Sequence, residues 1–404
     1  MPKSNAHLSL RFSDLAWSRA GNEALLPAPG PAFQYMFHGR YAIYRALRAV
    51  RSGSKRVVML PAYDCPVVPQ AILDAGMEPR YYDVGPDLSP DPDDVRRKWE
   101  DGGPRHVAAI IGTNFFGFPC DLSAITAEMR DSAVVIEDCA HSFLNCNPLR
   151  LAGGRERMTI YSFWKIVPCM FGGALAVARD GPEIPPGHGA VPLVESLRIA
   201  KRLFEQGLDN LESAGARRWF ARLDGAISRL KPRPRSPAFK RPGVELQAQI
   251  DRAEMENARL DQRLTAVPMP ALCRRILTAA DFPAIIEARR RNYSIYHEGL
   301  MEHRRVRKIF PALPEEVCPW VFPFILQGRL KERLDFRLRD QGVALHSFAS
   351  TLHPHLLEHA PSEMVGRARF LADNLLCLSV HQNLGQSEIE ASCEKINAFM
   401  SSLE

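Results

Sequence analysis

Apolar and polar positions predict helices and strands that take turns along the first half of the chain. Residues 39–52 (GRYAIYRALRAVRS) have apolar side chains at helical spacing, and the apolar run RVVMLPAY after them predicts a strand. The same order recurs over residues 65–85. Two compact apolar runs, 106–117 and 132–142, end in polar residues, as buried parallel strands do when functional groups lie at their carboxyl ends. The alternation predicts a doubly wound, mostly parallel α/β sheet.

The pattern changes after residue 190. Residues 191–231 are a long amphipathic helical stretch, and a basic, proline-rich segment (230–243) interrupts it before the helical pattern resumes. Helical and strand patterns then alternate again toward the C-terminus, which predicts a small α+β domain. We therefore expect a large domain over residues 1–190, a helical insertion over 191–265 and a small domain over 266–404.

Composition narrows the class of protein. The chain has 404 residues and 46% hydrophobic content, enough for a large core, and no apolar run approaches the roughly 18 residues needed to cross a bilayer. Nine cysteines without a CxxC pair predict reduced thiols in the cytoplasm and no zinc site. The net charge of +6 is modest, and the basic segment lacks interleaved aromatic residues. We expect no binding to nucleic acid or membrane.

Candidate chemistry gathers between residues 38 and 173. The apolar run VVIEDCAHS brings Asp138 and His141 to the end of a strand, and no second ligand group with recognisable spacing predicts a metal there. Lys165 follows within the apolar segment YSFWKIVPCMFGGALAV. Burial lowers the pKa of a lysine toward a free amine that can attack a carbonyl. A lysine that reaches the surface along its apolar stem is the alternative when Lys165 is considered alone.

A strand-end aspartate, a downstream lysine and a Gly-Gly pair are together the parts of a pyridoxal phosphate site, in which the aspartate holds the proton of the pyridinium ring. The order of the motifs HGRYAIYRAL, NFFGFPCDLSAI, IEDCAHS and YSFWKIVPCMFGGAL resembles the DegT/DnrJ/StrS family of aminotransferases. The resemblance extends over about residues 35–180 and 280–400. It implies an aspartate-aminotransferase-type fold (fold type I of these enzymes) with a smaller C-terminal α+β domain.

The resemblance also implies roles for individual residues. Lys165 forms the Schiff base with pyridoxal phosphate, Asp138 meets the pyridine nitrogen, and these two are the catalytic residues. The expected cofactor contacts are Gly39, Arg40, Tyr41, Tyr63, Asn114, Asp138, His141, Ser162 and Lys165. For Asn114 and Tyr63, turn or packing roles are the alternative.

The implied activity is transfer of an amino group from a donor such as glutamate to a keto acceptor, with keto-sugar nucleotides as candidates, by a homodimer. Two departures from the family pattern keep alternatives open. The segment SFWK is shorter than the usual serine-to-lysine spacing, and residues 191–265 lie where the family carries an Asn-Tyr-Arg lid cluster. A lyase of the same fold and an inactive binding homologue therefore remain alternatives. A Rossmann-type dehydrogenase is disfavoured because no GxGxxG follows the first strand.

Overall fold

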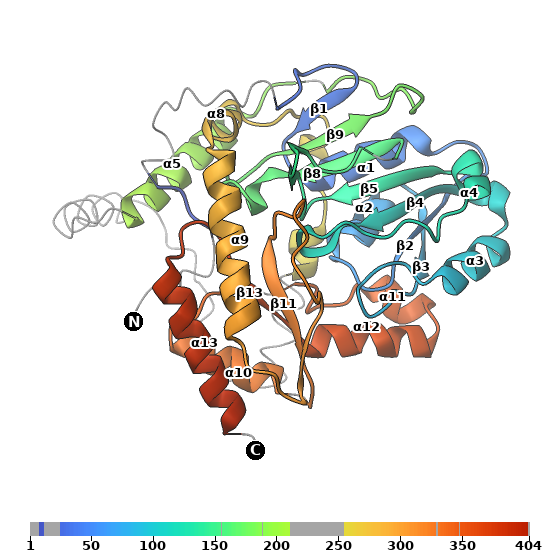
Figure 1. Ribbon diagram of the computed structural model, residues 1–404. Helices are drawn as coiled ribbons and strands as arrows, with labels where there is room; N and C mark the ends of the chain where they lie inside the picture. The colour runs from blue at the N-terminus through green and yellow to red at the C-terminus, as the bar shows by residue number, and fades with distance from the viewer. Residues whose placement is uncertain are drawn as a thin grey trace.

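A seven-stranded sheet forms the centre of the larger half of the molecule (Figure 1). The computed structural model describes residues 8–11, 25–154, 156–187, 189–210, 254–328, 330–346 and 348–402. The sheet order is β1-β9-β8-β5-β4-β2-β3, with β1 Phe33–Met36, β2 Val57–Pro61, β3 Glu78–Tyr82, β4 Val107–Thr113, β5 Val134–Cys139, β8 Met158–Ser162 and β9 Gly173–Val177. Strands β3, β2, β4, β5 and β8 run parallel, and β9 runs antiparallel between β8 and β1.

Helices connect the parallel strands as the apolar pattern predicts. They are α1 Gly39–Val50, α2 Val67–Asp74, α3 Pro92–Asp101 and the short α4 Ala127–Ser132. Helix α1 buries its apolar stripe, including Ile43, Leu47 and Val50, against the sheet. The predicted mostly parallel α/β architecture is confirmed.

The register of the strands brings their carboxyl ends to one edge. Thr113 at the end of β4 lies opposite Asp138 of β5, and Asp138 in turn lies opposite Ile160 of β8. The chain leaves β8 through a short 3₁₀ helix, η5 Phe163–Lys165, and returns as β9. The loop that carries Lys165 therefore begins beside the end of the strand that carries Asp138.

The C-terminal part forms a second, antiparallel sheet. Its order is β10-β11-β13-β12, with β10 Val306–Lys308, β11 Val321–Leu326, β13 Leu375–Ser379 and β12 Leu345–His346. Helix α9 Phe282–Gly299 runs beside this sheet in the middle of Figure 1 and packs against α13 Gln386–Ser401. The other helices of this part are α8 Ala271–Ala279, α10 Lys331–Asp340, α11 Pro354–His359 and α12 Ser362–Asn374. The predicted small α+β domain is present.

The predicted helical insertion begins with α5 Leu193–Asp209. Residues 211–253, which include the basic segment, lie outside the described residues. Residues 267–269 contact the large sheet, through a bridge between Met36 and Pro268 and a hydrogen bond from Met269 to Tyr35. The domain boundaries stay a prediction.

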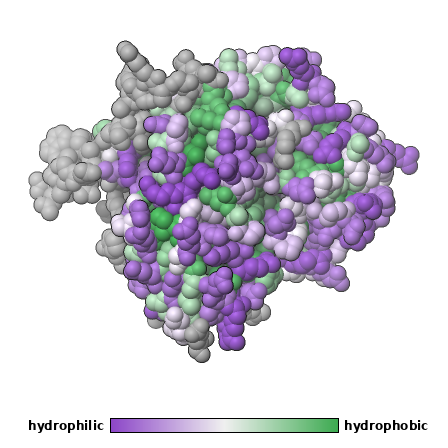
Figure 2. Space-filling view, in the orientation of Figure 1, coloured by the Kyte–Doolittle hydropathy of each residue, from purple (hydrophilic) through white to green (hydrophobic). Residues whose placement is uncertain are grey.

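Figure 2 shows a face on which hydrophilic side chains predominate, with smaller hydrophobic patches among them. No helix within the described ranges is long and apolar enough to cross a membrane. The nine cysteines are free thiols.

Candidate active site

Lys165 is the central candidate and lies at the end of η5, next to the carboxyl edge of the sheet. Its Nζ atom lies 4.8 Å from the centroid of the Trp320 ring, which the small domain contributes. Burial lowers the pKa of Lys165, and the nearby groups Cys65, Asp138 and Asp64 oppose that shift. A lowered pKa increases the fraction of free amine near neutral pH, which is the form that attacks a carbonyl.

Asp138 is buried at the end of β5, as predicted. Its Oδ1 atom accepts a hydrogen bond of 2.8 Å from the backbone N–H of Ala140. Burial raises the pKa of Asp138, and the positive charge of Lys165 is the largest opposing influence. Asp138 and Lys165 therefore lie close enough for the charge of each to shift the pKa of the other.

A second carboxyl group, Asp64, lies near both Asp138 and Lys165 and was not identified from the sequence. It follows β2, and its Oδ2 and Oδ1 atoms accept hydrogen bonds from the Thr113 hydroxyl (2.8 Å) and the Cys65 N–H (2.6 Å). Burial, followed by the negative charge of Asp138, raises the pKa of Asp64 from 3.8 to about 7. Two carboxyl groups that share a buried site resist double ionisation, so Asp64 holds its proton up to near-neutral pH.

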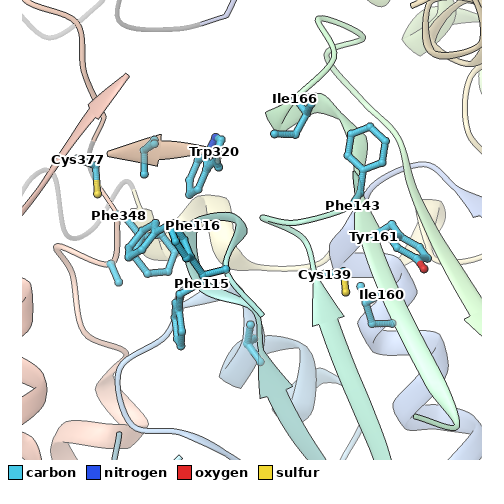
Figure 3. Packing of buried hydrophobic residues seen from close by; sticks show 14 of the residues in the cluster. Phe115, Phe116, Cys139, Phe143, Ile160, Tyr161, Ile166, Trp320, Phe348 and Cys377 are labelled. Atoms are coloured by element: carbon cyan, nitrogen blue, oxygen red, sulfur yellow. The ribbon is translucent and has the colours of Figure 1, made fainter. Parts of the chain in front are cut away.

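His141 lies in an aromatic cluster formed by both domains. Its ring stacks on Phe116 and lies 4.2 Å from Trp320 and 4.9 Å from Phe348, measured between centroids; Figure 3 shows these three aromatic partners together. The backbone N–H of Phe116 donates to Nδ1 at 3.3 Å. Burial, then the charges of Lys165 and His346, lower the pKa of His141 well below its usual value. Because Nδ1 accepts the hydrogen bond from Phe116, the neutral ring carries its proton on Nε2.

Buried polar atoms without partners gather at the N-terminus of α1. Among the described residues, four such atoms near this helix end are His38 Nδ1, Arg40 Nε, Ser162 Oγ and Trp164 Nε1. The first backbone amides of a helix also lack partners inside the helix, although the N–H of Tyr41 donates to the carbonyl of His38 at 3.0 Å. A buried polar atom left unpaired costs about 1–3 kcal/mol. This cluster therefore fits an anionic group such as a phosphate.

The Gly-Gly pair explains how α1 comes so close to the lysine loop. A Cβ atom at Gly173 would lie 2.5 Å from the backbone nitrogen of Gly39 and 2.7 Å from the carbonyl oxygen of Tyr161. A Cβ atom at Gly39 would lie 3.1 Å from Cβ of Ser162. Glycine at these positions lets the helix end touch β8 and β9, which places three of the expected cofactor contacts, Gly39, Arg40 and Ser162, near one another.

Two of the predicted contacts have protein partners instead. Asn114 donates to Glu137 (3.1 Å) and Cys139 (3.2 Å) and accepts from the N–H of Cys120 (2.8 Å). Tyr63 is fully buried, and its hydroxyl donates to the carbonyl of Phe348 at 3.0 Å. These contacts support the turn role for Asn114 and the packing role for Tyr63; direct contact with a cofactor stays a prediction for both.

A pocket beside Lys165 is walled largely by the small domain, and most of its wall was missed from the sequence. His346 and His381 line it. The lining residues are Leu8, Trp164, Lys165, Arg289, Trp320, Val321, His346, Ser379 and His381. Only the position of Trp320 at the start of an apolar strand hinted at burial. Among the described residues, no cluster of His, Cys, Asp and Glu could hold a metal ion.

Comparison with protein families supports the cofactor motifs. Residues 38–184 match the model of the DegT/DnrJ/EryC1/StrS aminotransferase family, and the predicted resemblance is confirmed. This range contains every residue predicted to contact the cofactor. The family is one of pyridoxal-phosphate-dependent aminotransferases, the enzyme class expected for this chain. No curated protein matches the sequence significantly.

Solved structures share the fold over almost the whole chain. The aminotransferase TlmJ from Streptoalloteichus hindustanus is 21% identical, with a TM-score of 0.61 and coverage of 95% of this chain and 89% of TlmJ. PseC from Helicobacter pylori, an aminotransferase involved in pseudoaminic acid biosynthesis, is 13% identical, with a TM-score of 0.59 and coverage of 98% and 93%. DesV from S. venezuelae is 17% identical, with a TM-score of 0.59 and coverage of 98% and 90%. At these identities the likeness shows the common fold.

Proposed function

Because residues 38–184 match a family of aminotransferases, we propose that this chain uses pyridoxal phosphate to move an amino group from an amino acid to a keto acceptor. The observation that carries the proposal is the position of Lys165. Its partly buried amine lies in the electrostatic field of Asp138, in a loop that starts beside the unpartnered polar atoms at the N-terminus of α1. The arrangement offers a nucleophile, a carboxylate and an anion site at one sheet edge.

The described residues fit the cofactor. The N-terminus of α1, with His38, Arg40, Ser162 and Trp164, would hold its phosphate, because each of these four side chains has a buried polar atom without a partner, although Nη1 of Arg40 also donates to the carbonyl of Asn257. Asp138 would hold the proton of the ring nitrogen. When bound, pyridoxal phosphate supplies a reactive carbonyl carbon and a ring that accepts electrons.

The proton chemistry belongs to residues of this chain. The lowered pKa of Lys165 lets its amine take a proton from the substrate carbon and return it, as general base and then general acid. His141 presents Nε2–H to the site because Nδ1 accepts from Phe116. Trp320 and the aromatic cluster around His141 exclude water, which strengthens these electrostatic interactions.

The finer parts of the proposal concern the substrates and the assembly. We propose glutamate as a donor and a keto-sugar nucleotide or related biosynthetic intermediate as acceptor; the involvement of PseC in pseudoaminic acid biosynthesis supports the second. We further propose a cytoplasmic homodimer. A lyase of the same fold is the competing function.

Absorbance spectroscopy tests the cofactor first. Purified full-length protein supplied with pyridoxal phosphate is expected to be yellow, and borohydride should fix the cofactor to Lys165, which peptide mass spectrometry can locate. Lys165→Ala should abolish both. Lys331→Ala is a matched control because burial also lowers the pKa of Lys331, which lies in α10 and does not line the pocket beside Lys165. A colourless wild type, or labelling that survives Lys165→Ala, contradicts the proposal.

Glutamate then separates the candidate reactions. An aminotransferase converts glutamate to 2-oxoglutarate in an amount equal to the cofactor, with loss of the yellow band. If glutamate and other common donors fail, a lyase is favoured. A screen of keto-sugar nucleotides against simple ketones identifies the acceptor.

A further inference from the structure

Arg289 is a fully buried cation that the catalytic proposal does not use. It lies in the middle of α9, with no exposed surface. None of the ion pairs formed by the described residues includes it. Burial lowers the pKa of Arg289 to about 10, so the guanidinium remains charged at neutral pH. A buried charge without a counterion needs another form of compensation.

Oxygen acceptors provide that compensation. The five hydrogen bonds run from Nε to Gln382 Oε1 (3.0 Å), from Nη1 to the carbonyls of Pro319 (3.3 Å) and Trp320 (3.2 Å), and from Nη2 to the carbonyls of Lys165 (3.2 Å) and Ile166 (3.4 Å). A guanidinium has five N–H donors, so all of them are engaged. Arg289 lines the pocket yet has no donor left for the carboxylate of a substrate.

The acceptors come from two separate parts of the chain. Lys165 and Ile166 belong to the loop after β8, whereas Pro319 and Trp320 precede β11 of the small domain. The side chains of Lys165 and Trp320 meet in the site, with Nζ 4.8 Å from the ring centroid. One rigid, planar group thus connects the backbones of both residues. Gln382 adds a second link, because its Nε2 donates to the carbonyl of Ile166 at 3.0 Å.

We propose that Arg289 is a positioning residue that holds the loop of Lys165 against the segment of Trp320 and so keeps the amine of Lys165 beside the Trp320 ring. The significance of this role for catalysis rests on the proposed function of Lys165. A lysine at position 289 retains the charge but not the planar fork that spans both backbones. The charge and the geometry of Arg289 can therefore be tested separately.

The test measures Lys165 directly in the full-length chain without added cofactor. Acetic anhydride labels free amines, and mass spectrometry of the Lys165 peptide at a series of pH values yields the pKa of this lysine. Because a released loop admits water, Arg289→Lys and Arg289→Met are both expected to raise the pKa of Lys165 by about one unit. Gln382→Leu removes the hydrogen bonds of Gln382 to Ile166 and to Arg289 but leaves Arg289 in place, so it should raise the pKa of Lys165 by less. This variant provides the measurement if the arginine variants fold poorly.

Arg290→Met is the matched control. Arg290 is the next residue in α9 and donates from Nη1 to the carbonyls of Pro314 (2.6 Å) and Val317 (2.7 Å), which lie in the segment before Trp320 and not in the loop of Lys165. This variant should leave the pKa of Lys165 unchanged. The proposal is overturned if Arg289→Lys titrates like the wild type, which would make charge alone sufficient, or if Arg290→Met gives an equal shift. The readout requires no catalysis, so it remains valid even if Lys165 proves not to bind pyridoxal phosphate.

Discussion

Replacement of Asp64 by asparagine should make the protein more stable above neutral pH, although it removes a buried, hydrogen-bonded residue. In the folded protein, burial and the charge of Asp138 raise the pKa of Asp64 from 3.8 to about 7. The folded state therefore binds the proton more tightly than the unfolded state. The penalty for ionising Asp64 is absent below about pH 4 and complete above about pH 7.

The size of the effect follows from that shift. One pKa unit corresponds to about 1.4 kcal/mol, so a rise from 3.8 to about 7 bounds the penalty at about 4 kcal/mol. Asparagine has one carboxamide oxygen in place of two carboxylate oxygens, and weaker bonding to the Thr113 hydroxyl and Cys65 N–H costs about 1 kcal/mol. We expect Asp64→Asn to gain about 2–3 kcal/mol at about pH 8 and to lose about 1 kcal/mol at about pH 4.

Urea denaturation of wild type and Asp64→Asn, both free of added cofactor, over this pH range provides the measurement. Asp83→Asn is a suitable control, because Asp83 is also buried after a neighbouring strand but pairs with Arg367. Its replacement removes one of the two ion pairs of Arg367, which also lies 4.0 Å from Glu363, so this variant should be no more stable than the wild type at alkaline pH. If Asp64→Asn destabilises equally at both ends of the range, the proton is not held at Asp64 and the carboxyl pair is misassigned.

Three further substitutions test separate parts of the site. Ser162→Ala should change the stability of the cofactor-free protein little, because Ser162 Oγ has no partner among the described residues. The variant should bind pyridoxal phosphate about 10-fold or more weakly in a spectroscopic titration. Unchanged affinity would show that Ser162 does not contact the phosphate. Gly173→Ala should lower the free energy of unfolding, measured by urea denaturation, by about 3 kcal/mol and should impair cofactor binding, since its Cβ would meet the backbone of Gly39. Gly366→Ala is the control and should be tolerated, because a Cβ there would meet open space. Asn114→Ala should lower the free energy of unfolding by about 1–3 kcal/mol without altering cofactor affinity, because it removes the hydrogen bond from the N–H of Cys120 to Asn114 Oδ1. A loss of affinity instead would establish cofactor contact.

Local pattern was sufficient for the order of elements and the identity of the central residues. The two apolar runs that end in polar groups form β4 and β5 as expected, because period and hydrophobicity are properties of neighbouring positions. The strand-end position of Asp138 and the spacing of Lys165 from the Gly-Gly pair, seven residues before Gly172, follow from the same local signals. The role of Gly173 could be named from its motif, although the reason for it, contact with the backbone of Gly39, lies in another segment.

Contacts between distant segments decided the rest of the site. Asp64 carries no motif, and it becomes a partner of Asp138 only because β2 and β5 flank β4 in the folded sheet. His346 and Trp320 belong to the small domain and reach Lys165 through the packing of one domain on the other. The sequence by itself therefore determined which strands form and which lysine is the candidate nucleophile. Only the tertiary structure decided the proton affinities and the pocket wall, because burial and the proximity of charges depend on residues far apart in the chain.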